Sequence, residues 1–192
     1  MNEASKAMRR RMLEDKLGIF NWSDIFIGNG IDVGCGPDKI KYDSCIAFDM
    51  EHGDANVISK YFTKKFDYLH ASQCLEHMHN PFDAIVEWLK IVRTGGHAIV
   101  SIPDWTLYEG FVWPSRNNPD HKSTWSFTHQ KSPAPHHVNI QDFLERLKPH
   151  AYAKRAMLID DNYDYSLSTK VDQTFNESDN VEAFIELVLC KI

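Results

Sequence analysis

Apolar residues occur along the chain in two kinds of segment: short continuous runs, and stretches with helical spacing. Short, mostly apolar runs occupy residues 25–33, with Gly28-Asn29-Gly30 as a boundary, and residues 45–49, 66–72 and 97–102. Parallel strands are buried on both faces and therefore contain few polar residues, so these runs predict strands of a parallel sheet. Between the last two runs, the apolar residues of 81–92 recur with the period of a helix that has one buried face.

The chain begins and ends with further elements of the same kinds. Residues 2–17 favour a helix that ends at Gly18, and residues 140–147 resume helical spacing before a proline. A strand is expected at 152–159, and the apolar residues of 181–192 predict a last strand. The polar, acidic stretch between these strands, 160–180, is expected to be an exposed loop. Strands alternating with helices predict an α/β fold.

A glycine turn follows the first predicted strand. Gly34 and Gly36 allow positive φ angles and close approach of a ligand to the backbone. The dinucleotide-binding fingerprint needs a third glycine, and Lys39 stands in its place, so the fingerprint fails. Asp32, two residues before the first glycine, suits a ligand with a positive end, such as the ammonium group of an amino acid.

A carboxylate also follows the second predicted strand. Asp49 ends the apolar run 45–49, and an acidic residue there can accept hydrogen bonds from both hydroxyls of a ribose. The alternative is an ordinary loop aspartate. Few residues separate Asp49 from Asp54, so a second crossover helix is absent or vestigial, and the sheet is expected to be trimmed on this side.

Several motifs in order resemble the class I S-adenosylmethionine-dependent methyltransferases. The chain carries D-x-G-x-G at 32–36, S-x-x-L-E-H at 72–77 and N-P at 80–81. A predicted helix, Gly95-Gly96 and an apolar strand ending at Pro103-Asp104 complete the resemblance. It implies a Rossmann-like three-layer sandwich around a mostly parallel seven-stranded sheet whose last strand is antiparallel. It also implies one methyltransferase domain over residues 1–192.

The same resemblance implies S-adenosyl-L-methionine as methyl donor and S-adenosyl-L-homocysteine as product. The glycines and Asp32 would hold the methionine portion, Asp49 the ribose, and Asp54 with Ala55 the adenine. For His77 alone, a structural role behind the cleft is favoured over a chemical one. The cofactor-binding residues implied are Asp32, Gly34, Cys35, Gly36, Asp49, Met50, Asp54, Ala55, Ser72, Gln73 and His77.

Residues 105–139 interrupt the alternation of strand and helix. A long connection rich in aromatic residues is usually functional, and we interpret it as a lid or acceptor pocket over the strand ends. A small satellite core with ordinary buried tryptophans is the alternative. Within and beside this segment, His121 is the first candidate for a general base, followed by Asp104 and His129. The histidines lack metal-ligand spacing, so the sequence predicts no metal site.

Composition and net charge argue against some classes of function. The chain has 192 residues, of which 43% are hydrophobic and 25% charged, as in ordinary soluble proteins. The formal net charge of −6 argues against a nucleic-acid binder, and no apolar run is long enough to span a membrane. Four scattered cysteines indicate reduced thiols in a cytoplasmic protein. The sequence does not indicate an oligomeric state.

The function expected from these observations is methyl transfer to a small molecule or sugar. A binding protein or subunit that retains the cofactor or a nucleoside without catalysis is the second hypothesis, motivated by the short connections between Gly36 and Asp54. A nicotinamide-dependent oxidoreductase is the third. Nothing in residues 105–139 identifies the acceptor atom.

Overall fold

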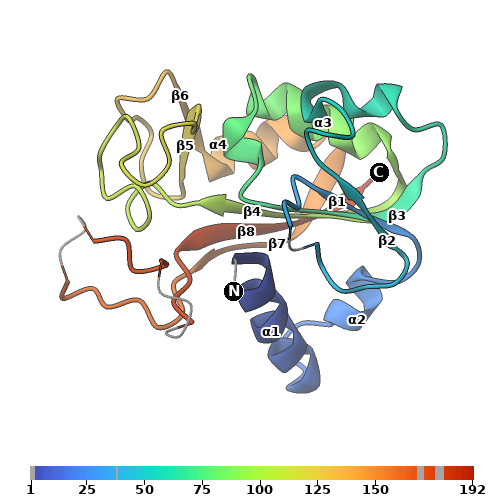
Figure 1. Ribbon diagram of the computed structural model, residues 1–192, viewed down its shortest axis with the longest axis horizontal. Coiled ribbons are helices and arrows are strands. Elements are labelled where there is room, and N and C mark those ends of the chain that lie inside the picture. Colours follow the sequence, from blue (N-terminus) through green and yellow to red (C-terminus); the bar gives the residue numbers. More distant parts are fainter. Residues whose placement is uncertain (1–2, 38, 168–170, 176–179) are drawn as a thin grey trace.

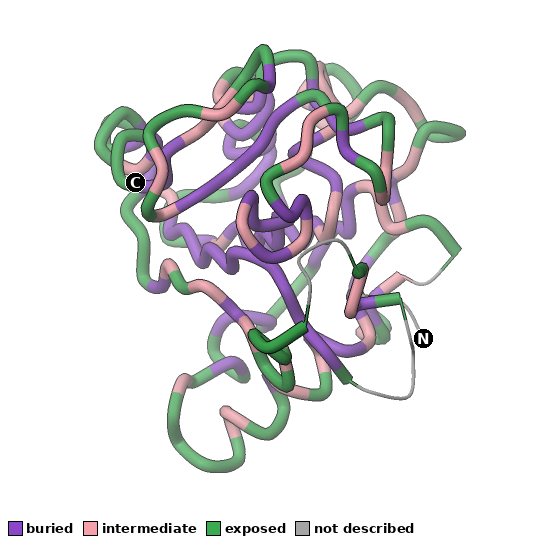
Figure 2. The backbone as a smooth tube through the Cα atoms, turned by 90° about the vertical axis from the view of Figure 1, so that its left-hand side faces the viewer, coloured by how far each residue is buried: buried purple, intermediate pink, exposed green. Residues whose placement is uncertain are grey.

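A six-stranded sheet organises the protein in a computed structural model that describes residues 3–37, 39–167, 171–175 and 180–192. The strand order is β2-β1-β3-β4-β8-β7, and β8 runs antiparallel to both of its neighbours. Helices cover both faces of the sheet, with α1 and α2 on one side and α3 and α4 on the other (Figure 1). Buried strands pass through the centre of the molecule, and exposed loops surround them (Figure 2). The predicted three-layer α/β sandwich is confirmed.

The elements follow the predicted order closely. The strands of the main sheet are β1 (Gly30–Val33), β2 (Cys45–Phe48), β3 (Phe66–Ser72), β4 (Val92–Pro103), β7 (Ala151–Ile159) and β8 (Phe184–Lys191). The helices are α1 (Glu3–Lys16), α2 (Trp22–Ile25), α3 (Pro81–Lys90) and α4 (Ile140–Leu147), and the 3-10 helices are η1 (Ala55–Lys60) and η2 (Leu75–His77). Residue 2 of the predicted first helix, and 168–170 and 176–179 of the predicted loop, lie outside the described residues.

Three predictions about the sheet were wrong. It has six strands where seven were expected, because the chain after β2 forms the 3-10 helix η1 and adds no further strand. The apolar run 25–33 is divided: Ile25 ends α2, and β1 begins only at Gly30. Residues 94–96 lie inside β4, where the pairing with β3 shifts register, and do not separate a helix from a strand.

One face of the sheet packs against α3, α4 and part of segment 105–139. Asn80 and Asn139 cap the two helices, each accepting hydrogen bonds from two backbone N–H groups of the first turn. Trp125 is fully buried in this core, and its ring meets that of Phe143 edge-on, with centroids 5.0 Å apart. The aromatic segment therefore contributes to the main core.

Segment 105–139 also contains its own small sheet. Strands β5 (Ser123–Ser126) and β6 (His136–Asn139) pair in parallel. Among the described residues of 160–180 there is no helix or strand. None of the helices within the described ranges is long and apolar enough to cross a membrane.

The face covered by α1 holds a buried polar network that crosses the sheet. Arg11 is fully buried, and its guanidinium donates to Glu186 on β8, to Ser101 on β4 and to Nε2 of His70 on β3, at 2.8–3.1 Å. Because His70 Nε2 accepts from Arg11, its proton is on Nδ1, which donates to Asp32 on β1 at 2.6 Å. The network therefore joins α1 to four strands.

Candidate functional site

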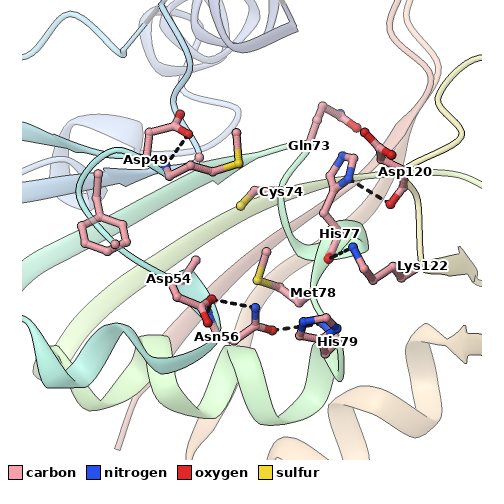
Figure 3. Close-up of a pocket in the computed structure, with 15 residues that line it drawn as sticks. Asp49, Asp54, Asn56, Gln73, Cys74, His77, Met78, His79, Asp120 and Lys122 are labelled. Carbon is pink, nitrogen blue, oxygen red and sulfur yellow. Dashed lines mark hydrogen bonds between the residues drawn. The ribbon is translucent and has the colours of Figure 1, made fainter.

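A cavity of about 670 Å³ lies at the carboxyl ends of β1, β2 and β3 (Figure 3). The chain leaves β1 toward β2 on one side and returns to β3 on the other, so the strand order reverses here, where open α/β sheets bind ligands. The cavity is lined by Gly34, Phe48, Asp49, Met50, Gly53, Asp54, Ala55, Asn56, Gln73, Cys74, His77, Met78, His79, Asp120 and Lys122.

The glycine turn after β1 forms one wall. Gly34 has a φ of +68°, and a Cβ atom on it would lie 2.5 Å from Sγ of Cys74. Gly36 has a φ of +54°, but a Cβ atom there would meet open space. Only glycine therefore fits position 34, both for its backbone conformation and for its contact with the chain after β3.

Asp49 connects the end of β2 to this turn. One oxygen of its carboxylate accepts from the backbone N–H of Gly36 at 2.6 Å, and the other accepts from the N–H of Met50 at 2.7 Å. The side chain is partly exposed and lines the cavity. A carboxylate in this position can accept hydrogen bonds from ligand hydroxyls.

Asp54 caps the 3-10 helix η1 at the other end of the cavity. Its Oδ1 atom accepts from the backbone and side-chain nitrogens of Asn56, both at 2.8 Å, and these hydrogen bonds lower the pKa of Asp54. Trp88 of α3 donates its indole N–H to the carbonyl of Ala55 at 2.9 Å, which fixes the turn to the core.

Gln73, Cys74 and His77 line the side of the cavity that follows β3. Gln73 has a φ of +53° and donates its N–H to the carbonyl of Ser101, so the chain bends sharply as it leaves β3. His77 follows on η2 and lines the cavity. Burial lowers the pKa of His77, and the electrostatic effect of the neighbouring His121 lowers it further, so His77 is neutral at pH 7.

The structure brings together most of the cofactor-binding residues that the motifs implied. Seven line the cavity: Gly34, Asp49, Met50, Asp54, Ala55, Gln73 and His77. Cys35 and Gly36 lie in the adjoining turn but do not line the cavity. Ser72 is absent from the lining, and its hydroxyl is buried without a hydrogen-bond partner among the described residues.

Asp32 also lies away from the cavity. Its carboxylate points into the network under α1, where it accepts from His70 and from the backbone N–H of Ile40 at 2.8 Å. It therefore anchors the chain that leaves the glycine turn.

Sequence reasoning missed several lining residues. They are Phe48, Gly53, Asn56, Cys74, Met78, His79, Asp120 and Lys122. Most are neighbours of residues that were predicted. Asp120 and Lys122 come from the aromatic segment, and only the folded chain shows that they reach this cavity.

The three candidates for a general base do not line this cavity. Asp104 is buried and caps its own loop, accepting from Thr106 and Leu107, while burial raises its pKa. His129 contacts the hydroxyls of Ser126 and Thr128. His121 is buried directly behind the cavity, and its Nδ1 atom donates to Glu109 at 2.6 Å.

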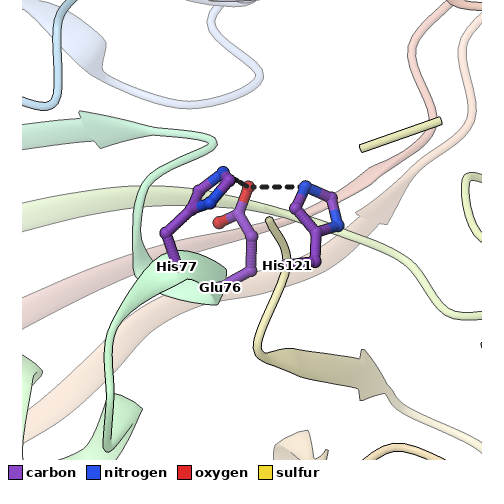
Figure 4. A group of neighbouring side chains, drawn as sticks. All are labelled: Glu76, His77 and His121. Carbon is purple, nitrogen blue, oxygen red and sulfur yellow. Dashed lines mark ion pairs between the residues drawn. The ribbon is translucent and has the colours of Figure 1, made fainter. Parts of the chain in front are cut away.

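His121 belongs to a cluster with Glu76 and His77 (Figure 4). One ligand-capable atom from each residue lies within 4.8 Å of the other two. Burial raises the pKa of Glu76 to about 7, against the opposing attraction of His121. The cluster joins η2 to the aromatic segment beside the cavity.

Comparison with known proteins identifies the fold. No model of a known protein family matches the sequence, and a search of curated proteins found no similar sequence. Solved structures do match. A SAM-dependent methyltransferase from Archaeoglobus fulgidus superposes with a TM-score of 0.53 at 13% identity, over 95% of this chain and 94% of that one.

Two further matches are methyltransferases solved with S-adenosyl-L-homocysteine. The N-methyltransferase NodS from Bradyrhizobium japonicum has a TM-score of 0.51 at 11% identity, over 99% of this chain and 88% of that one. The plantazolicin methyltransferase BamL, also bound to a triazolic desmethylPZN analogue, has a TM-score of 0.55 at 14% identity, over 98% and 86%. This chain therefore has the Rossmann-like fold of the class I methyltransferases, with one strand fewer than the seven implied by its motifs.

Proposed function

We propose that this protein is an S-adenosyl-L-methionine-dependent methyltransferase that acts on a small molecule or sugar. The cavity at the switch point of the sheet carries the proposal, because it joins a glycine turn to carboxylates at both ends. Its volume of about 670 Å³ lies in the range of small-molecule sites. The fold of the solved methyltransferases supports the same assignment.

Different lining residues suit different parts of the cofactor. The close approach at Gly34 suits the methionine portion, Asp49 the ribose hydroxyls, and Asp54 with Ala55 the adenine. His77 lies on the side where the sulfonium and its methyl group would be. A sulfonium is an activated leaving group, so the main task of the protein is to align acceptor, methyl carbon and sulfur.

The acceptor would approach beside Asp120 and Lys122. These residues bring the aromatic segment to the rim of the cavity, which supports its interpretation as part of an acceptor pocket. Two matched structures are described as an N-methyltransferase, NodS, and a plantazolicin methyltransferase, BamL, and those activities are properties of those proteins.

The location of the protein in the cell is a separate point. The free thiols of Cys35, Cys45, Cys74 and Cys190 support a reducing compartment, the cytoplasm.

Calorimetry and a transfer assay test the proposal. Saturable binding of S-adenosylmethionine and S-adenosylhomocysteine, followed by transfer of a tritiated methyl group to pooled small metabolites, is the expected result. Binding without transfer to any pool would favour the non-catalytic binding protein. Saturable binding of NADH, with no affinity for either sulfur compound, would instead indicate an oxidoreductase.

Replacing Asp49 tests the ribose contact directly. The Asp49→Ala substitution removes two charge-assisted hydrogen bonds to the ligand, each contributing about 1.5 kcal/mol or more. We expect it to weaken S-adenosylhomocysteine binding by about 100-fold or more, measured by calorimetry. Asp43→Ala, which removes an exposed carboxylate from the loop before β2, serves as the control. Equal affinities in both variants would contradict the placement of the ribose at Asp49.

A further inference from the structure

A fully buried carboxylate without a hydrogen-bond partner lies beside the cavity. Neither oxygen of Glu76 has a partner among the described residues, although its side chain has no exposed surface. Its Oε1 atom is 3.8 Å from Nε2 of His121 and 3.9 Å from Nε2 of His77 (Figure 4). Buried charges without a partner are costly, so this arrangement calls for a positive group.

Neither histidine donates a hydrogen bond to Glu76, because both Nε2 atoms lie beyond hydrogen-bond distance of its Oε1 atom. His121 Nδ1 contacts the carboxylate of Glu109 at 2.6 Å, and His77 Nδ1 contacts the carbonyl of Asp120 at 3.3 Å. Both partners accept hydrogen bonds, so each Nδ1 atom carries a proton and each Nε2 atom is left to act as a metal ligand. Two imidazole nitrogens and one carboxylate therefore converge on one point.

We propose that Glu76, His77 and His121 bind a divalent transition-metal ion such as Zn²⁺. Two imidazole nitrogens and one carboxylate form a ligand set that such ions use in catalytic sites, with a fourth position open. Bonds of about 2.0–2.2 Å place tetrahedral ligand atoms about 3.4 Å apart. The carboxylate lies 3.8 and 3.9 Å from the two nitrogens, and all three ligand atoms lie within 4.8 Å of one another, so the cluster contracts when it takes up an ion.

The surroundings of the cluster match those of metal ligands. Histidines that bind metals usually donate their other N–H to a carboxylate or a carbonyl, as His121 does to Glu109 and His77 to Asp120. The ligand-bearing segments are also held together by backbone contacts: Lys122 donates its N–H to the carbonyl of Glu76 at 2.8 Å. The site is therefore organised before an ion binds.

The position of the site indicates what the ion would do, an inference that rests on the proposed function. His77 lines the cavity, so an ion held by His77 would lie beside the space proposed for the cofactor. An acceptor hydroxyl that reached the ion would lose its proton to solvent more easily. Its oxygen then forms a bond to the methyl carbon as the carbon–sulfur bond breaks, and the electron pair stays on sulfur. The site thus favours O-methylation.

Metal binding is measured independently of turnover. The full chain, dialysed against EDTA and then against buffer, is titrated with Zn²⁺ by calorimetry and with Co²⁺ by visible absorption. We expect one ion per chain and ligand-field bands from Co²⁺. Glu76→Gln and His121→Ala should each weaken Zn²⁺ binding at least ~100-fold, and Glu109→Gln about 10- to 100-fold. His136→Ala, which removes an exposed histidine of β6, should bind as the unmodified chain does.

Two results would overturn the metal site. One is a folded chain, verified by circular dichroism, that binds no ion. The other is a Glu76→Gln variant with unchanged affinity for Zn²⁺, which would mean that Glu76 is not a ligand of the ion. S-adenosylhomocysteine binding is measured on the same samples and should persist in EDTA. If that binding fails while Zn²⁺ still binds, the proposed function falls and the metal site stands.

Discussion

Glu186→Gln should lower the free energy of unfolding at pH 7 by about 3–5 kcal/mol, the usual cost of breaking a buried ion pair. The carboxylate of Glu186 has no exposed surface, and it accepts from Arg11 at 2.8 Å and from Arg10 at 2.7 Å. An uncharged amide at position 186 leaves the buried positive charge of Arg11 without the carboxylate that neutralises it. Chemical denaturation, followed by circular dichroism, measures the change.

The pH dependence of the free energy of unfolding provides a second test, which is specific to the carboxylate of Glu186. Burial alone would raise the pKa of Glu186, but attraction to Arg11 and Arg10 lowers it to about 2 from the ordinary value of 4.5. A group whose pKa is lower in the folded state stabilises the protein above its unfolded pKa, and the contribution is lost as pH falls toward the folded pKa. About 3 kcal/mol should therefore disappear between about pH 4.5 and 2. Glu186→Gln should flatten the curve there.

An exposed glutamate supplies the control for both measurements. Glu145 pairs with Lys148 on the surface, where the side chain is 68% exposed, and such pairs contribute little to stability. Glu145→Gln should change the free energy of unfolding by less than about 0.5 kcal/mol and leave its pH dependence unaltered. A Glu186→Gln variant that behaves like Glu145→Gln would show that the network under α1 does not hold the fold together.

Local pattern was sufficient to predict most of the fold. The strand at 66–72 and the helix at 140–147 agree with β3 and α4 residue for residue, because each is bounded by turn or cap residues. The division of run 25–33 could not be predicted in this way, since short apolar runs suit a helix turn or a strand equally. The only sequence feature that indicated a smaller sheet was the short interval between Asp49 and Asp54.

Long-range contacts explain what the sequence could not show about the site. Asp32 matched a motif for binding an ammonium group, yet its carboxylate lies against His70 because β1 and β3 pair in register at these two residues. Glu76 and His77 were visible as a motif, but His121 joins them from another segment. Ligand-spacing rules detect sites whose residues are close in sequence, and this cluster is assembled by the fold.

Gly34→Ala tests whether the glycine turn is shaped as the structure describes. A left-handed backbone costs a non-glycine residue about 1–2 kcal/mol, and overpacking against Sγ of Cys74 at 2.5 Å adds about 1–3 kcal/mol. We expect Gly34→Ala to destabilise the protein by about 2–5 kcal/mol. The added methyl group also displaces the chain after β3, so S-adenosylhomocysteine binding should fall below detection by calorimetry.

Gly36 provides a control that shares the strain without the contact. Its φ of +54° is also left-handed, so Gly36→Ala should lose only about 1–2 kcal/mol of stability, because open space surrounds the new Cβ atom. Thermal or denaturant unfolding of the two variants separates the contact from the strain. Similar losses in both would mean that Cys74 moves aside and that the wall of the cavity is softer than its geometry indicates. A larger loss at Gly34 would confirm the close contact between the turn after β1 and Cys74, which follows β3.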